Sequence, residues 1–212
     1  MQPEPAQQPD ARRSLGAVTV VWVAALVVSG IAPYDRLTWW MEVAPVLIAL
    51  PLLLATRGAF PFTTLAYGLI CAHGLILIAG GTYTYARVPA GFWVQDWLAL
   101  ERNPYDRLGH FAQGFVPAIV AREILTRTFR LATNRFLFFI ITCICLAGSA
   151  FYELIEWWSA LVLGQGAHEF LGTQGDEWDT QWDMFLALCG AIASQILLAR
   201  WHDWQLTAVP RS

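Results

Sequence analysis

Three polar residues and a proline recur at helical spacing along one segment: Asp106, His110, Gln113 and Pro117. Residues that lie four, seven and eleven positions apart share one helix face. An Asp and a His one turn apart can hold a divalent metal together, or the carboxylate can orient an imidazole that acts as a general base. A hydrogen bond between helices, without any chemistry, explains this segment equally well when it is considered alone.

Two further segments place carboxylates at helical spacing. Glu153 and Glu156 lie one turn apart, and such carboxylates repel each other unless a cation, a proton or an arginine lies between them. A solvated helix end would hold both without a ligand. Asp176, Asp179 and Asp183 form a similar stripe if their helix begins near residue 176, and the helix dipole accounts for one of the three.

The three acidic segments are expected at one depth in a membrane. Glu153 follows Arg135 by 18 residues, about 27 Å of helix, and Asp183 precedes Arg200 by 17 residues, about 26 Å. A hydrocarbon core is about 30 Å thick, so both acids fall at its outer boundary. The segment 106–110 begins at the same level and reaches about 6 Å further in. The three segments therefore converge if their helices are neighbours.

These positions define a predicted site. The predicted metal ligands, for one or two Mg²⁺, Mn²⁺ or Zn²⁺ ions, are Asp106, His110, Glu153, Glu156, Asp176, Asp179 and Asp183. The predicted catalytic groups are His110, His73 and Glu156, with a histidine as the general base. The predicted substrate-binding residues are Arg102 and Arg107, which can hold a phosphate, together with Gln113, Tyr83 and Tyr85.

The other histidines are less informative. His73 lies near the middle of an apolar stretch, where a lone histidine more often bonds to a neighbouring helix. An ionisable group inside a membrane span is nevertheless a candidate for function. His168 and His202 fall in a predicted loop and a predicted tail, and we assign them no role.

The elements that must position these residues are membrane helices. Of the 212 residues, 57% are hydrophobic and only 14% are charged, whereas a soluble domain carries about 25% charged residues. A net charge of -3 leaves no basic surface for nucleic acid, and the composition also excludes a disordered chain and a disulfide scaffold. The sequence predicts an all-α, polytopic membrane bundle of about six transmembrane helices, at 15–33, 39–55, 62–82, 106–122, 136–158 and 182–199.

Arginine placement predicts the orientation. If the N-terminus is cytoplasmic, nine of the 13 arginines lie on the cytoplasmic side, and 12 of the 16 acidic residues lie in the outer half. The positive-inside rule then places both termini in the cytoplasm. We expect a single transmembrane domain over residues 14–204, a disordered cytoplasmic tail over 1–13 and a second tail over 205–212.

Four motifs resemble those of the YjdF-like bacterial inner-membrane proteins, a family described as a domain of unknown function. They span about residues 60–200 and consist of His73 with the Gly-Gly-Thr-Tyr-Thr-Tyr stretch at 80–85, and of the runs at 103–110, 152–157 and 174–183. The order of an Asp-x3-His motif, an acidic helix end and an Asp-rich final segment also looks like the VanZ-like membrane proteins, although Arg107 stands where a Lys often occurs. The resemblance implies a multi-pass protein of the bacterial inner membrane and no settled reaction.

Three functions remain open. The first is a divalent-metal-dependent enzyme that acts on a lipid headgroup or a lipid-linked substrate at the outer face of the membrane. The second is a cation or proton transporter, which the expected lack of a polar path through the cytoplasmic half disfavours. The third is a non-catalytic protein that binds a lipid, an antibiotic or a partner protein.

Overall fold

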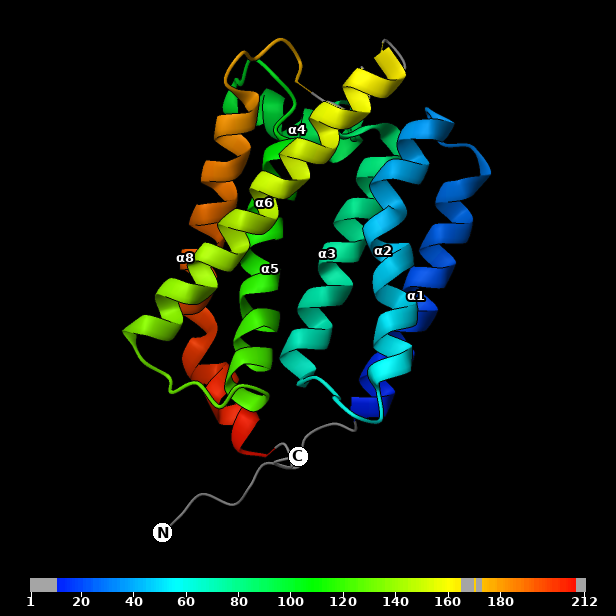
Figure 1. Cartoon of the computed structure of the whole chain (residues 1–212). Coiled ribbons are helices and arrows are strands. Elements are labelled where there is room, and N and C mark those ends of the chain that lie inside the picture. The colour runs from blue at the N-terminus through cyan, green and yellow to red at the C-terminus, as the bar shows by residue number, and fades with distance from the viewer. Residues whose placement is uncertain (1–10, 165–169, 171–172, 209–212) are drawn as a thin grey trace.

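The chain folds into a bundle of long helices (Figure 1). The computed structural model describes residues 11–164, 170 and 173–208. Within those residues no strand occurs, and a 3-10 turn η1 (Tyr85–Arg87) and a short helix α4 (Pro89–Leu98) link two of the long helices. The long helices are α1 (Ala11–Ile31), α2 (Arg36–Thr56), α3 (Thr64–Tyr83), α5 (Tyr105–Arg127), α6 (Arg135–Leu163) and α8 (Asp179–Thr207).

Each of the long helices covers one of the predicted apolar stretches. Among the described residues, α1, α2, α3, α6 and α8 are long and apolar enough to cross a membrane. α5 is more polar, but its 23 residues correspond to about 35 Å, enough to cross the hydrocarbon core. It lies inside the bundle against α3, α6 and α8, which removes its ionisable groups from lipid. The all-helical membrane bundle is thus confirmed, and the six-span topology stays a prediction.

The helices extend beyond the expected boundaries. α1 begins at Ala11, so Arg12 and Arg13 belong to this helix and not to a tail. α8 continues to Thr207, past the expected limit at 204. Hydropathy marks where a helix leaves the hydrocarbon, and a helix whose backbone is internally hydrogen-bonded continues into the polar region. The rest of the predicted tails, 1–10 and 209–212, and His168 lie outside the described residues.

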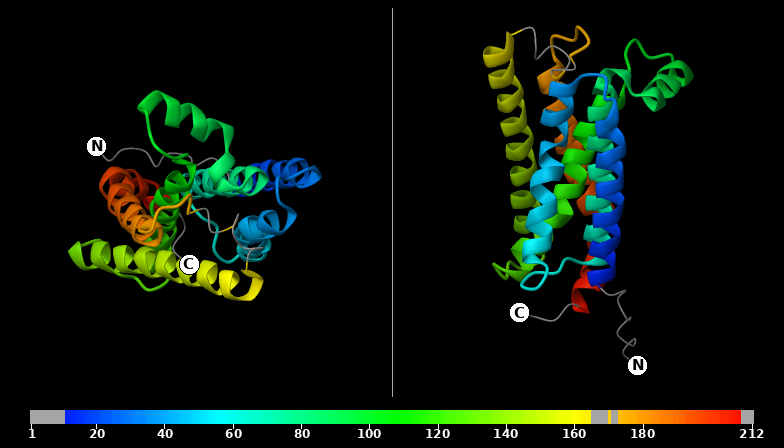
Figure 2. Two further views of the ribbon diagram at one scale, coloured as in Figure 1. Left: turned by 90° about the horizontal axis from the view of Figure 1, so that it is seen from above. Right: turned by 90° about the vertical axis from the view of Figure 1, so that its right-hand side faces the viewer.

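The central pair of helices is α5 and α8. Gly114 of α5 lies against the backbone of Ala187, and Gly190 of α8 lies against the backbone of Phe111, so a Cβ at either glycine would overlap the opposite helix. Small residues at such crossings let membrane helices approach closely. This approach brings the Asp106–His110 face of α5 against the start of α8. α6 packs on both helices, and α3 joins them to α1 and α2 (Figure 2).

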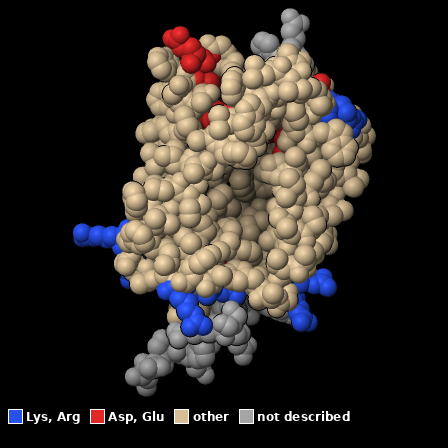
Figure 3. Space-filling model, in the orientation of Figure 1, with Lys and Arg blue, Asp and Glu red and all other residues tan. Residues whose placement is uncertain are grey.

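The two ends of the bundle differ in charge. The first residue of α1 and the last residue of α8 lie at the same end (Figure 1). Arginine side chains gather at this end, and acidic side chains are visible toward the other (Figure 3). We refer to them as the arginine-rich end and the acidic end. This distribution is the one that the predicted orientation requires, with the arginine-rich end in the cytoplasm.

Candidate functional site

Three helices bring carboxylates to His110 near the acidic end. Its Nε2 lies 3.5 Å from Asp106 Oδ1 on the same helix and 3.7 Å from Asp183 Oδ2 on α8. Its Nδ1 lies 3.8 Å from Glu153 Oε1 on α6. The four side chains are buried. The structure therefore brings together residues from all three acidic segments of the sequence.

Two sets of these side chains have the geometry of a metal site. Asp106, His110 and Asp183 form one set, and His110, Glu153 and Glu156 form the other, each with ligand atoms within 4.8 Å of one another. Ligands at about 2.1 Å from one ion lie within about 4 Å of each other, so small side-chain movements would close the first set. In the second set Glu153 is nearest to His110 Nδ1, which would bind an ion only without its proton. The two sets share His110, which makes this imidazole the centre of the site.

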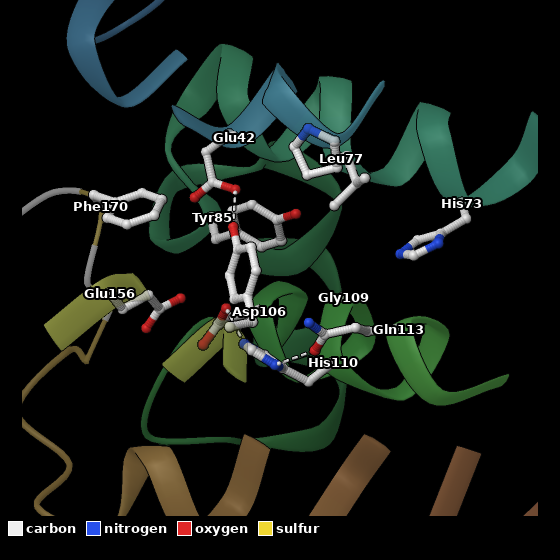
Figure 4. Close-up of a pocket in the computed structure, with 12 residues that line it drawn as sticks. Glu42, His73, Leu77, Tyr85, Asp106, Gly109, His110, Gln113, Glu156 and Phe170 are labelled. Carbon is white, nitrogen blue, oxygen red and sulfur yellow. Dashed lines mark hydrogen bonds and ion pairs between the residues drawn. The ribbon is translucent and has the colours of Figure 1, made fainter. Parts of the chain in front are cut away.

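The orientation of the His110 ring is set by Gln113. The Gln113 Oε1 atom lies 3.0 Å from His110 Nδ1 (Figure 4). A carbonyl oxygen only accepts, so Nδ1 carries the proton and Nε2 is directed at Asp106 and Asp183. A metal-bound histidine usually donates its other N–H in this way. Gln113 thus positions the imidazole, and because it also lines the cavity, the predicted substrate contact stays a prediction.

A cavity of about 150 Å³ opens beside this imidazole, between α2, α3, α5 and α6. Figure 4 shows the side chains that face it. Sequence reasoning missed Glu42 of α2, which is 4% exposed and whose Oε2 accepts a hydrogen bond of 3.4 Å from Tyr152. The sequence could have identified it, since Glu42 is a lone acid within an apolar stretch. The lining residues are Glu42, Pro45, His73, Leu77, Tyr85, Asp106, Gly109, His110, Gln113, Tyr152, Glu156 and Phe170.

Negative charge exceeds positive charge around the cavity. We define the outer cluster as Glu42, Asp106, His110, Glu153, Glu156 and Asp183, in which five carboxylates surround one imidazole. Asp183 is 1% exposed, and among the described residues neither its buried Oδ1 nor the buried Glu153 Oε1 has a hydrogen-bond partner. A buried carboxylate oxygen without a donor is strongly destabilising. Protons or a bound cation must therefore offset part of this charge.

The remaining two aspartates of the predicted ligand set bind arginine. Asp179 Oδ1 lies 2.6 Å from Arg102, and Asp176 Oδ2 accepts from both Arg102 (3.4 Å) and Arg107 (3.3 Å). α8 begins at Asp179, so Asp176 precedes the helix and does not continue the expected stripe. The stripe prediction was wrong at this position, because the residues before 179 form a turn in which Asp176 Oδ1 accepts from the Trp178 amide. Both arginines hold this turn against α5.

The predicted tyrosines and His73 lie at different places. Tyr85 lines the cavity, wedged between Gly80 of α3 and Gly109 of α5. Burial raises the pKa of its phenol well above the usual range, so the hydroxyl stays protonated. Tyr83 is 44% exposed and does not face the cavity. His73 faces the cavity away from the carboxylates (Figure 4), and its buried Nε2 has no hydrogen-bond partner in the part of the chain that the structure describes.

A second buried polar group lies toward the arginine-rich end, where the sequence predicted none. Glu123 accepts hydrogen bonds from the Thr63 amide (3.0 Å) and hydroxyl (2.8 Å), His202 Nε2 lies 3.0 Å from it, and Arg127 lies 2.6 Å from it. His202, which we had placed in a tail, is fully buried in α8. We call Thr63, Arg122, Glu123, Arg127, His202 and Asp203 the inner cluster, in which Arg122 lies 2.7 Å from Asp203.

Known proteins resemble this chain over most of its length. The family described as "Predicted membrane protein (DUF2238)" matches residues 15–204. The inner membrane protein YjdF of Escherichia coli (strain K12) is 59% identical over 181 residues, which cover 85% of this chain and 87% of the relative. No solved structure matches. The inner-membrane location is confirmed by this relative, whereas the likeness to VanZ-like proteins stays a prediction. The chain belongs to the DUF2238 family of predicted membrane proteins.

Proposed function

We propose that the outer cluster binds a divalent cation and that the protein is an enzyme that uses this cation on a lipid headgroup or a lipid-linked substrate. One observation carries the proposal: Asp183 and Glu153 each keep a buried carboxylate oxygen without a donor beside His110. A purely structural cluster would supply a donor for each oxygen, as the inner cluster does for Glu123. A cation held by the Asp106–His110–Asp183 set would contact Asp183, one held by the His110–Glu153–Glu156 set would contact Glu153, and either would lower the excess of negative charge.

The donor set favours a hard or borderline metal ion. Carboxylate oxygens with one imidazole suit Mg²⁺, Mn²⁺ or Zn²⁺. Asp106, His110 and Asp183 are the first candidates, because Gln113 leaves His110 Nε2 directed at both aspartates. A cation held there would polarise a phosphoryl or carbonyl group, or activate a water.

His73 supplies a second polar group to the same cavity. It faces the cavity from α3, and its buried Nε2 has no partner in the described structure. An imidazole in this position can accept a proton from a substrate held at the outer cluster. We therefore propose His110 as a metal ligand and His73 as the general base.

Metal content tests the cation site. Purified protein is equilibrated with Mn²⁺, and bound Mn²⁺ is counted by elemental mass spectrometry and electron paramagnetic resonance. We expect about one or two ions per chain in the wild type and at least a tenfold weaker affinity in Asp183→Asn, since the loss of even a residue that hydrogen-bonds to a metal ligand costs about 10–100-fold. The control is Asp96→Asn, which changes an exposed acid of α4. A wild type without Mn²⁺, Mg²⁺ or Zn²⁺, or an Asp183→Asn variant that binds normally, would overturn the proposal.

A turnover assay separates an enzyme from a binding protein. The Mn²⁺-loaded protein is incubated with a total lipid extract of bacterial inner membranes, and lipid species are followed by mass spectrometry. We expect one class to be consumed by the wild type and retained with His73→Gln, which keeps all predicted metal ligands. If metal binds and no lipid changes, the protein is a non-catalytic binding protein and the catalytic part of the proposal fails.

One observation favours transport as a second candidate. The inner cluster places buried ionisable groups in the half of the bundle where the sequence predicted no polar path. Between the two clusters, Ser149 and Ser194 are fully buried and their hydroxyl oxygens have no hydrogen-bond partner among the described residues. Cation or proton uptake into proteoliposomes that is lost in both Asp183→Asn and Ser194→Ala would favour this function over catalysis.

A further inference from the structure

The cavity beside the outer cluster has an incomplete side wall. α2 packs against α1 and α3, α6 packs against α5 and α8, and α2 and α6 make little contact with each other. α6 is tilted, so that it approaches α2 near the acidic end and lies further away toward the arginine-rich end (Figures 1 and 2). On this face the space-filling view shows a hollow, with acidic atoms above it (Figure 3). We call the part of the cavity between Glu42 and Pro45 of α2 and Tyr152 of α6 the side opening.

The side opening is polar at the level of the outer cluster and apolar below it. At the polar level, the Tyr152 hydroxyl donates to Glu42 across 3.4 Å, which is long for a hydrogen bond between oxygens. About one turn further along, Pro45 continues the wall formed by α2, and Gly148 is an exposed residue of α6 four positions before Tyr152. A Cβ at Gly148 would meet no atom within 4 Å, so open space remains beside this turn of α6.

The side opening faces the hydrocarbon. α2 and α6 both have the length and composition of membrane-spanning helices. The outer surfaces that flank the opening are apolar, with Ile48 and Leu52 of α2 and Ile144 and Phe151 of α6 all exposed on the bundle. In a membrane these side chains contact lipid, and so does whatever group lies between them. A molecule that enters here comes from the bilayer.

The size of the cavity limits what it can enclose. Its volume is about 150 Å³. This is room for a cation with a phosphate-sized group, and it is too small for a whole lipid. A lipid headgroup therefore fits inside only if its hydrocarbon chain remains in the side opening.

The geometry points to a phosphate-bearing amphiphile that enters sideways from the outer leaflet, with its phosphate at the outer cluster and one hydrocarbon chain between α2 and α6. This inference rests on the proposed function, because a phosphate beside five carboxylates requires the bound cation. It adds the entry route and the class of substrate: a molecule with both an anionic head and an alkyl chain. A water-soluble phosphate would contact the cluster alone.

A pair of ligands tests this inference. With Mn²⁺ present, calorimetry compares dihexanoyl phosphatidylglycerol, below its micelle concentration, with glycerol 3-phosphate. We expect the amphiphile to bind about 200-fold more tightly, because burial of about four methylenes gives that factor. Equal affinities would identify a free phosphate solute as the ligand and overturn the inference.

Two tryptophan variants test the side opening itself. Gly148→Trp fills the open space beside α6, and we expect at least a tenfold loss of amphiphile affinity with unchanged Mn²⁺ binding. Gly16→Trp is the matched control, because Gly16 of α1 also faces open space. If Gly148→Trp does not fold, Gly148→Leu replaces it. Wild-type affinity in a folded Gly148 variant would overturn the inference.

The calorimetric experiment separates the proposed cation-dependent function from the proposed entry through the side opening. If the wild type binds no Mn²⁺ before lipid is added, the proposed function has failed. If Mn²⁺ binds normally and the amphiphile has no advantage over glycerol 3-phosphate, only the side entry has failed.

Discussion

The outer and inner clusters use the same helices and similar residues with opposite results. In both, a buried histidine and a buried acid face each other across α5 and α8. In the inner cluster, His202, Arg127 and Thr63 satisfy both oxygens of Glu123. In the outer cluster, Asp183 and Glu153 each retain an oxygen for which residues 11–164, 170 and 173–208 supply no donor. The inner cluster is complete by itself, and the outer cluster is not.

This contrast separates a structural polar group from a candidate site. A fully paired buried charge strengthens the packing that surrounds it, and its removal leaves partners unpaired. A cluster with excess charge stores an unfavourable interaction, which a ligand can relieve. Residue type alone does not distinguish the two, since both contain histidine, carboxylates and nearby arginine. The balance of donors and acceptors does.

The largest expected effect is in the inner cluster. Glu123→Gln removes the charge that faces Arg127 and His202, and we expect the free energy of unfolding to fall by about 3–5 kcal/mol. Unfolding in detergent, followed by circular dichroism, measures this change. If Glu123→Gln is no less stable than Asp183→Asn, the distinction between the clusters is wrong.

The second-largest loss of stability is expected at the crossing of α5 and α8, the two helices that both clusters share. Gly114→Ala places a methyl group against the Ala187 backbone, which can yield only if α5 and α8 separate. We expect a loss of about 1–3 kcal/mol and weaker Mn²⁺ binding at the outer cluster. Gly148→Ala serves as control, because its added methyl group meets no neighbour and alanine favours a helix. Equal losses in both variants would show that the crossing is not tightly packed.

Removal of Arg102 tests the ion pair that holds the start of α8 beside the outer cluster. Arg102→Ala leaves Asp179 without its charged donor, and we expect a loss of about 2 kcal/mol in thermal unfolding experiments. Arg107→Ala should cost less than about 1 kcal/mol, because the Arg107 side chain is 36% exposed. If the two variants are equally stable, the Arg102–Asp179 pair does not hold the start of α8.

The smallest effect on the metal-free protein is expected at Asp183. Asp183→Asn removes a charge that lacks a full set of donors, so stability without cation should stay within about 1 kcal/mol of wild type or rise. Addition of Mn²⁺ at 100 times the wild-type Kd should stabilise the wild type by about 2.7 kcal/mol and the variant, whose affinity is at least tenfold weaker, by about 1.4 kcal/mol or less. Differential scanning fluorimetry with and without Mn²⁺ measures both. A large loss in metal-free Asp183→Asn would make the outer cluster structural.

The local sequence pattern was sufficient to predict the long helices and to predict which polar residues share one side of a helix. Long apolar stretches predicted the long helices, and the spacing from Asp106 to Gln113 placed His110 and its partner on one side of α5. The pattern failed where partners come from distant segments. Glu42 and Tyr152 lie 110 positions apart, and Glu123 and His202 lie 79 apart, yet each pair is in contact.

Composition and periodicity alone establish that this chain is a membrane bundle with acidic groups at one level, because hydropathy and helical spacing act within single segments. They do not establish which acids are paired. That depends on the close approach of α5 and α8 at Gly114 and Gly190, on the position at which α8 begins, and on the gap between α2 and α6. Donors and acceptors are matched only when helices pack, so tertiary structure decides that Glu123 is satisfied and Asp183 is not.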